Sequence, residues 1–168
     1  MMDSSYPQSK SERIRFEGRG EAKAIALLIA QHAKKQICIL GRDIDHALFD
    51  SPEFIECVSA LARRNAHTEI RILVHDTRIN VQNNHKLIHL AQQLSSSIHI
   101  HNTAKQHRTI QNILLLVDDF GYLTCPKATQ YNGTANLYDR LEVRTLQQQF
   151  DDMWQQSSPD ITVRRLHL

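Results

Sequence analysis

The sequence predicts an α/β fold in which a mixed, largely parallel central sheet is flanked by helices. Short apolar runs recur along the chain and are separated by longer amphipathic segments. This alternation of strands and helices is typical of a layered α/β sheet. The composition is that of a globular domain, since 41% of the 168 residues are hydrophobic and 23% are charged. A chain of this length can bury a full core, so we expect a single domain over residues 12–168.

The first part of the chain gives the alternating pattern. Residues 1–11 are polar and rich in serine, which predicts a flexible tail, and Arg13 to Phe16 alternates as a short edge strand does. Ser51 followed by Pro52 is typical of a helix start. Apolar periodicity predicts helices over residues 21–35, 51–65 and 81–94, and strands over residues 37–40, 69–74 and 98–101.

The second part begins with a hairpin. The apolar run Ile113 to Val117 and the run Tyr122 to Cys125 are separated by Asp-Asp-Phe-Gly, which is turn chemistry. A long helix is expected over residues 137–156 and a last strand over residues 161–168. The helix residues expected to point mostly inward are Leu141, Val143, Leu146, Phe150 and Trp154.

Composition also limits the function classes. A net charge of +2 provides no global attraction for nucleic acid or membrane, and residues 1–10 lack the apolar stretch of a signal peptide. Cys38, Cys57 and Cys125 lie in apolar runs, so we interpret them as reduced core residues of a cytoplasmic protein. No Gly-x-Ser-x-Gly elbow, Walker loop or Gly-x-Gly-x-x-Gly fingerprint is present. We expect no cofactor.

Two polar segments follow predicted strands and mark a candidate ligand site. Ligands of α/β sheets gather at the carboxyl ends of the strands. Paired guanidinium groups there can bind a phosphate or a carboxylate, whereas nearby carboxylates would instead hold the arginines in structural ion pairs. Both interpretations stay open, with Asp43, Asp45 and Asp76 as the acids that could pair the arginines. The six predicted ligand-binding residues are Arg42, Asp43, His75, Asp76, Arg78 and Asn136.

Four of the ten histidines have spacings that would align their rings. His85 and His89 are four apart in a predicted helix, and His99 and His101 are two apart in a predicted strand. Neutral imidazoles at such spacings can bind zinc, although no acidic residue completes a known zinc motif. The alternative is that these histidines are solvated, and we assign no metal.

The stretch from Arg108 to Leu137 resembles the phospholipase D-like superfamily. There a strand carries His-x-Lys, four more residues and Asp, and a later Gly-Ser-x-Asn and an acidic residue complete the site. Aligning Asp118 with the motif Asp puts Gln111 at the His position and Ile113 at the Lys position. Aligning Asp119 instead puts Asn112 and Leu114 there. Gly133-Thr134-Ala135-Asn136 resembles the later segment, and Glu142 follows as the acid.

The resemblance implies a phospholipase D-like layered fold without the catalytic groups. The family's His attacks phosphorus and its Lys holds the phosphate oxygens, and neither Gln nor Ile can do this. The sequence therefore predicts a non-catalytic domain that binds a partner, dimerises or senses a ligand. One alternative is a phosphate- or nucleic-acid-binding groove at Arg42, Arg78, Arg108 and Asn136. Another is a divergent phosphodiesterase with His107 or His75 as nucleophile.

A second resemblance concerns the segments GRDIDHALFDSPEFIECV, RILVHDTR and FDDMWQQS. They are similar to an uncharacterised bacterial domain often found behind a GNAT-type acetyltransferase domain. No acetyl-CoA loop is present here, so that activity is not implied. The resemblance, over about residues 13–157, implies an adaptor or ligand-sensing role. Homodimers are common among single-copy phospholipase D-like domains, and the expected strand with Ile161, Val163 and Leu166 could add to a second sheet.

Overall fold

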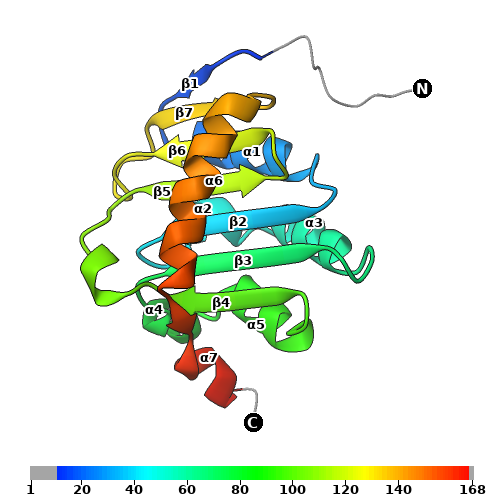
Figure 1. Ribbon diagram of the computed structural model, residues 1–168, viewed down its shortest axis with the longest axis vertical. Helices are drawn as coiled ribbons and strands as arrows, with labels where there is room; N and C mark the ends of the chain where they lie inside the picture. Colours follow the sequence, from blue (N-terminus) through cyan, green and yellow to red (C-terminus); the bar gives the residue numbers. More distant parts are fainter. Residues whose placement is uncertain (1–10, 167–168) are drawn as a thin grey trace.

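The computed structural model describes residues 11–166, so the predicted tail lies outside the described residues except for Ser11. The described chain forms one eight-stranded sheet with the strand order β1-β7-β6-β5-β2-β3-β4-β8 (Figure 1). The strands are β1 (Ile14–Phe16), β2 (Gln36–Gly41), β3 (Glu69–Val74), β4 (Ile98–Asn102), β5 (Ile113–Val117), β6 (Gly121–Cys125), β7 (Gly133–Asn136) and β8 (Ser158–Pro159).

The α/β fold class is confirmed, but the sheet is mostly antiparallel and not largely parallel. Only β2 with β3 and β3 with β4 pair in parallel. The helix-containing connections before β3 and β4 allow parallel pairing, because such a crossover returns the chain to the same end of the sheet. The short connections among β5, β6 and β7 reverse the chain each time and therefore give antiparallel pairs.

The helices cover the two faces of the sheet unequally. The 16-residue helix α6 (Arg140–Gln155) crosses one face, where it packs on a small apolar cluster that includes Cys38, Leu73 and Leu116. The other face carries the large core. The helices that contribute to that core are α1 (Arg19–Ala30), α2 (His46–Phe49), α3 (Pro52–Ala62), α4 (Arg78–Gln82), α5 (Lys86–Gln93) and α7 (Ile161–Leu166).

Two predicted elements are wrong. The last strand is instead the helix α7, because Asp160 Oδ1 accepts a hydrogen bond from Val163 N at 2.8 Å and so caps a helical turn. The helix predicted over residues 81–94 is two helices, α4 and α5, separated by Asn84 in a left-handed conformation with φ 54°. Leu141 was also expected to face inward, but it is 80% exposed.

The other predicted strands and helices within residues 11–166 are present, with small changes in their boundaries. The hairpin β5–β6 has its turn at Asp118 to Phe120, and every residue of β5 is buried. Cys38 and Cys125 are buried, Cys57 is partly buried, and the three thiols form no disulfide. Within residues 11–166, no helix combines the length and apolarity that crossing a membrane requires.

Candidate functional site

Asp118, the residue aligned with the Asp of the phospholipase D-like motif, follows β5 and lies beside the amino end of β2. Its carboxylate accepts hydrogen bonds from three consecutive backbone groups, Lys34 N at 2.9 Å, Lys35 N at 2.8 Å and Gln36 N at 2.9 Å. Asp118 is buried and has φ 54°, a conformation that Asp and Asn tolerate better than most residues. The acid thus joins the β5–β6 turn to the segment that enters β2, and its oxygens face the protein backbone.

The motif positions for His and Lys lie at the opposite end of β5. Gln111 is exposed in the segment before the strand, and its carbonyl accepts a hydrogen bond from Ala128 N at 2.8 Å. Ile113 is 2% exposed and belongs to the large core. In the alternative alignment the Lys position is Leu114, which is 3% exposed and belongs to the cluster under α6. In either of the two alignments expected from the sequence, the residue set against the motif Lys is a core aliphatic side chain.

Asn136 lies apart from Gln111 and Ile113. Strand pairing places Asn136 beside Tyr122 and Tyr122 beside Leu116, on the α6 face of the sheet, whereas Ile113 faces the large core. The Asn136 side chain is buried, accepts a hydrogen bond from Tyr138 N at 3.0 Å and donates one to Ser11 Oγ at 3.5 Å. Glu142 is exposed on α6 near Tyr122, and burial together with this acid raises the pKa of Tyr122. The segment Gly133–Asn136 therefore forms the strand β7.

The two polar segments predicted to meet at the carboxyl ends of β2 and β3 do lie together. The Arg42 carbonyl accepts hydrogen bonds from His75 N at 3.0 Å and from Asp76 N at 3.2 Å. The His75 ring, in the loop after β3, contacts the loop after β4 and the segment before β5. Its Nδ1 lies 2.6 Å from Thr103 Oγ1, and its Nε2 lies 2.8 Å from the Ile110 carbonyl. Both ring nitrogens of His75 are therefore occupied, and the ring holds the loops after β3 and β4 against the segment before β5.

Carboxylates dominate the interior of this cluster. Burial raises the pKa of Asp43, and the neighbouring Asp45 and Asp76 add to this effect. Asp45 Oδ1 caps α2 by accepting from Leu48 N at 3.0 Å, and its Oδ2 accepts from Tyr131 Oη at 2.9 Å. Burial and Asp45 raise the pKa of Tyr131 to about 12. These acids therefore work against an anion in the same space.

The two arginines of the cluster differ. Arg78 is exposed and its guanidinium is held by Asp76, with Nη2 to Oδ2 at 2.7 Å, so the hydrogen bond from Arg78 lowers the pKa of Asp76. Arg42 is partly buried and its Nε, which is fully covered, has no hydrogen-bond partner. Arg42 is the cation of this cluster with a free donor. The arrangement therefore places one unpaired, covered donor beside several acids, whose charge a bound anion would have to overcome.

The four candidate metal ligands are not brought together. His85 is buried at the N-cap of α5, where Nδ1 accepts from Leu87 N at 3.1 Å, and His89 is exposed within that helix. His99 and His101 lie on β4, where the His101 ring stacks on Trp154 of α6 with centroids 3.9 Å apart. α5 packs on the opposite face of the sheet from α6. In the part of the chain that the structure describes, no group of three or more His, Cys, Asp or Glu residues is placed to hold a metal ion.

Sequence reasoning missed two residues of the carboxyl-end cluster. Tyr131 donates to Asp45, and the Arg19 guanidinium lies 5.2 Å from the centre of the Tyr131 ring. Tyr131 is 86 positions from Asp45 in the sequence, and no local pattern indicates such a contact. His107, the alternative nucleophile, ends a short 3₁₀ helix before Arg108, and its covered Nδ1 has no partner.

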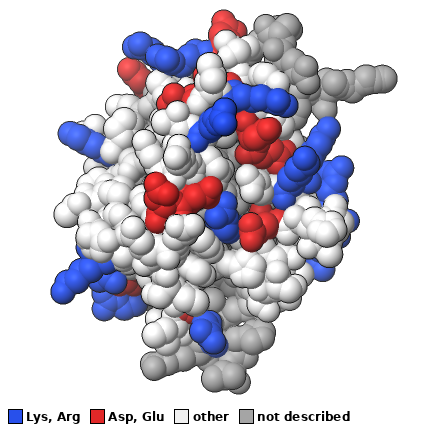
Figure 2. All heavy atoms as spheres, in the orientation of Figure 1, with Lys and Arg blue, Asp and Glu red and all other residues white. Residues whose placement is uncertain are grey.

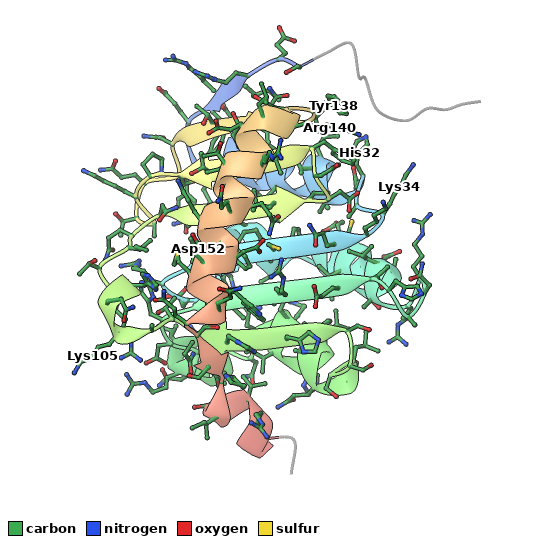
Figure 3. All side chains as sticks on the ribbon, viewed as in Figure 1. His32, Lys34, Lys105, Tyr138, Arg140 and Asp152 are labelled. Carbon is green, nitrogen blue, oxygen red and sulfur yellow. The ribbon has the colours of Figure 1, made fainter. Side chains whose placement is uncertain are left out.

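Asp118 and Gln111 flank opposite ends of β5, and labelled residues close to each in the chain or in space lie on opposite sides of the view in Figure 3. Lys34, next to the Asp118 carboxylate, lies at the right of the view, and Lys105, in the segment that leads to Gln111, lies at the left. Asn136, which the sequence grouped with Arg42 and Arg78, is the last residue of β7 and pairs with Tyr122 of β6. The predicted six-residue ligand site therefore divides into a five-residue cluster at the carboxyl ends and a separate asparagine in β7.

Comparison with solved structures gives the same fold. The phospholipase D family member Nuc from Salmonella typhimurium is similar with a TM-score of 0.60 and 16% identity, over 89% of this chain and 99% of Nuc. NucT from Helicobacter pylori is similar with a TM-score of 0.61 and 8% identity, over 89% of this chain and 99% of NucT. The phospholipase D-like fold is therefore confirmed.

A third similar structure is TrmBL2, described as an archaeal chromatin protein with a novel mode of DNA binding. Its TM-score is 0.62 at 11% identity, and the match covers 88% of this chain but only 54% of TrmBL2, so this chain spans about half of that protein. No curated protein matches the chain. Residues 18–166 match a family described as a domain of unknown function (DUF7931), and the chain belongs to that family.

Proposed function

We propose that this protein is a catalytically silent phospholipase D-like domain that acts by binding a partner. One observation carries the proposal: the residue at the motif Lys position is a core aliphatic side chain, Ile113 or Leu114, in either alignment. A phosphate in the family's site needs a cation within reach of its oxygens, and a buried aliphatic group supplies neither charge nor hydrogen-bond donor.

The remaining motif residues support a structural use. Asp118 is engaged by three backbone donors, and Asn136 holds the start of the segment that leads to α6. The candidate replacement nucleophiles do not supply the missing parts. His75 has both ring nitrogens occupied, and His107 is followed by Arg108, which is exposed and lies near Asp76.

The test is an assay of phosphodiester hydrolysis. Purified protein is incubated with bis(p-nitrophenyl) phosphate and with single- and double-stranded DNA, and we expect no turnover above that of buffer. The matched controls are His107→Ala and His75→Ala. Hydrolysis by the wild-type protein that disappears in either variant would contradict the proposal and identify a relocated nucleophile.

A phosphate or nucleic-acid ligand at the carboxyl-end cluster is the second candidate function. The covered, unpartnered Nε of Arg42 favours it, as does the likeness in fold to a DNA-binding chromatin protein. Binding of inorganic phosphate or of a DNA duplex should then fall in Arg42→Ala and Arg78→Ala, and DNA affinity should fall steeply with salt. Affinity that neither variant changes excludes this candidate.

A further inference from the structure

Exposed cations gather on two loops at the amino ends of β2 and β3. Lys34 and Lys35 precede β2, whereas Arg63 and Arg64 follow α3 in the loop that leads to β3, and all four residues are exposed. The loops lie side by side, because β2 and β3 pair from their first residues and Glu69 N donates to the Lys35 carbonyl at 3.1 Å. We call these four residues the basic loop cluster.

The charged groups of the cluster are not used by the fold. The Lys34 and Lys35 backbone N–H groups donate to the Asp118 carboxylate at 2.9 and 2.8 Å, which fixes the loop while both side chains stay exposed. Arg63 Nε donates to Ser59 Oγ at 3.0 Å. Among residues 11–166, none of the four cations takes part in an ion pair. Most of their donors are therefore free to bind a ligand.

Helix dipoles explain only part of this arrangement. Both α1 and α3 end here, and the partial negative charge at the carboxyl end of a helix attracts cations within the last turn. The last turns of α1 and α3 contain no basic residue. Arg63 is the C-cap of α3, but Lys34 lies four residues beyond the end of α1. The dipole thus accounts for Arg63 and not for the lysines.

A cleft of about 520 Å³ opens beside the cluster, between the end of α1 and the outer side of α3. Arg64 lines this cleft together with Ala33, which directly precedes the two lysines. Ala60 and Leu61 of α3 add apolar surface. The cleft therefore offers space for a small aliphatic group next to a free guanidinium.

The positive charge of the cluster is limited in extent. Glu53 and Glu56 line the same cleft further back along α3, and Asp119 is exposed next to Asp118. Figure 2 shows blue side chains along the right-hand edge of the molecule, where Figure 3 places Lys34, and red ones on the face beside them. A long polyanion would extend past the cluster onto these acids, whereas a short acidic segment would not.

We propose that the basic loop cluster binds a short acidic segment of a partner protein. Carboxylates of the segment pair with the exposed cations, and a neighbouring aliphatic side chain enters the cleft beside Arg64. The bounding acids disfavour a nucleic acid, and the apolar part of the cleft favours a protein. The inference rests on the proposal that the domain acts by binding, but its surface lies at the opposite end of β2 and β3 from Arg42 and Arg78.

The probe is an acetylated peptide with one leucine flanked on each side by a pair of glutamates, titrated into uniformly ¹⁵N-labelled protein at low ionic strength. We expect the amide signals of residues 31–35 and 63–68 to shift, and the affinity to fall with added salt, because the paired charges are exposed. The same peptide with glutamine in place of glutamate should bind at least about ten-fold more weakly. Equal binding of the two peptides, or shifts confined to other residues, overturns the proposal.

Charge-reversed variants test the location. Lys34→Glu combined with Lys35→Glu, and Arg63→Glu combined with Arg64→Glu, should each weaken the acidic peptide at least about ten-fold. Lys34→Gln combined with Lys35→Gln removes the charges without adding carboxylates beside Asp118, and should weaken binding in the same direction by a smaller factor. Full affinity in these variants would exclude the cluster.

The matched control makes the same change in net charge elsewhere. Arg13 and Arg15 are exposed at β1, which is the edge strand of the sheet. Arg13→Glu combined with Arg15→Glu should leave peptide binding unchanged. A loss equal to that of the cluster variants would show that net charge alone governs binding, and would overturn the assignment of the site.

Other occupants give different outcomes, each of which overturns the peptide proposal. A short DNA duplex that binds more tightly than the peptide, and loses affinity in the cluster variants, indicates a nucleic-acid site. Phosphatidylserine vesicles that bind with the same dependence indicate a membrane surface. Hydrolysis of phosphodiesters, by contrast, would overturn the catalytically silent function while peptide binding at the cluster still held, so the two failures are distinguishable.

Discussion

The two ends of strand β5 differ in what their side chains do. At its carboxyl end, Asp118 accepts hydrogen bonds from three backbone N–H groups. At its amino end, Gln111 is exposed and Ile113 is buried in the large core. The comparison teaches that an acid at one end of this strand can have a structural role while the residues at the other end supply neither a nucleophile nor a cation.

The largest effect is expected when a cation is placed at the position that the alignment sets against the motif Lys. Ile113→Lys places an ammonium group in the large core, and we expect it to lower the free energy of unfolding by about 4 kcal/mol, because a buried unpaired charge is costly. Leu114→Lys should behave alike in the α6 cluster. Urea denaturation measures both, with Ile113→Val, expected to cost about 1 kcal/mol, as the control. A loss below about 1 kcal/mol for Ile113→Lys would show that a lysine there reaches solvent.

Removing the Asp118 carboxylate should have the next largest effect on stability. Asp118→Ala leaves three backbone donors without their acceptor, and we expect a loss of about 3 kcal/mol in the free energy of unfolding. Asp118→Asn keeps one acceptor oxygen and should lose about half as much. Asp119→Ala, at the exposed neighbour, is the matched control and should change stability by less than about 0.5 kcal/mol. Equal effects at the two positions would contradict the structural role of Asp118.

The stability of the fold should also depend on pH through His85, the buried residue that caps α5. Burial lowers the pKa of this ring, against the opposing effect of Asp50 and Asp45, and His46 lowers it further. The unfolded chain therefore takes up the proton first, so stability is fully present above about pH 6.5 and falls as the pH drops toward the folded pKa. Burial and His99 lower the pKa of His101, which acts in the same direction.

Thermal unfolding between about pH 5 and pH 7.5 measures this response, since the raised pKa of Asp43 acts with the opposite sign and at lower pH. His85→Asn keeps a side chain that can cap α5 and should reduce the pH dependence. His89→Asn, at an exposed position of the same helix, should leave it unchanged. An unaltered slope in His85→Asn would show that other groups carry the response.

The smallest effect on stability is expected from placing a histidine alone at position 111, which the alignment sets against the motif His. Gln111 is exposed, so Gln111→His should change the free energy of unfolding by less than about 0.5 kcal/mol. Because no cation stands beside it, the variant should not hydrolyse bis(p-nitrophenyl) phosphate. Turnover that appears in Gln111→His but not in Gln111→Asn would show that the rest of the phosphate site is intact.

The local elements of the fold could be predicted because each has a local pattern. The apolar run Ile113 to Val117 and its turn predicted the hairpin, and Ser51 with Pro52 predicted the start of α3. The helix α7 was missed, because Ile161 and Val163 alternate as a strand would. The capping contact from Asp160, which the sequence does not mark, decides in favour of the helix.

For the candidate site, the sequence predicted that the loops of Arg42 and His75 would meet, and the structure places them in hydrogen-bond contact. It could not predict that Asn136 stays inside the sheet, since that depends on the register of β6 with β7. The ligand roles of these residues remain predictions. The four histidines that the sequence singled out are not brought together, because α5 and β4 present His85 and His101 to opposite faces of the sheet.

The amino-acid sequence predicted the strands and helices of most of the chain, and it showed which residues occupy the positions of the proposed motif alignment. Both are local properties, set by side-chain periodicity and residue identity. Only the tertiary structure decided the mostly antiparallel order of the sheet and the contacts of the Asp118 carboxylate. These depend on hydrogen bonds between residues far apart in the chain, such as the 84 positions that separate Lys34 from Asp118. Such contacts follow from how the layers pack, and no local pattern encodes them.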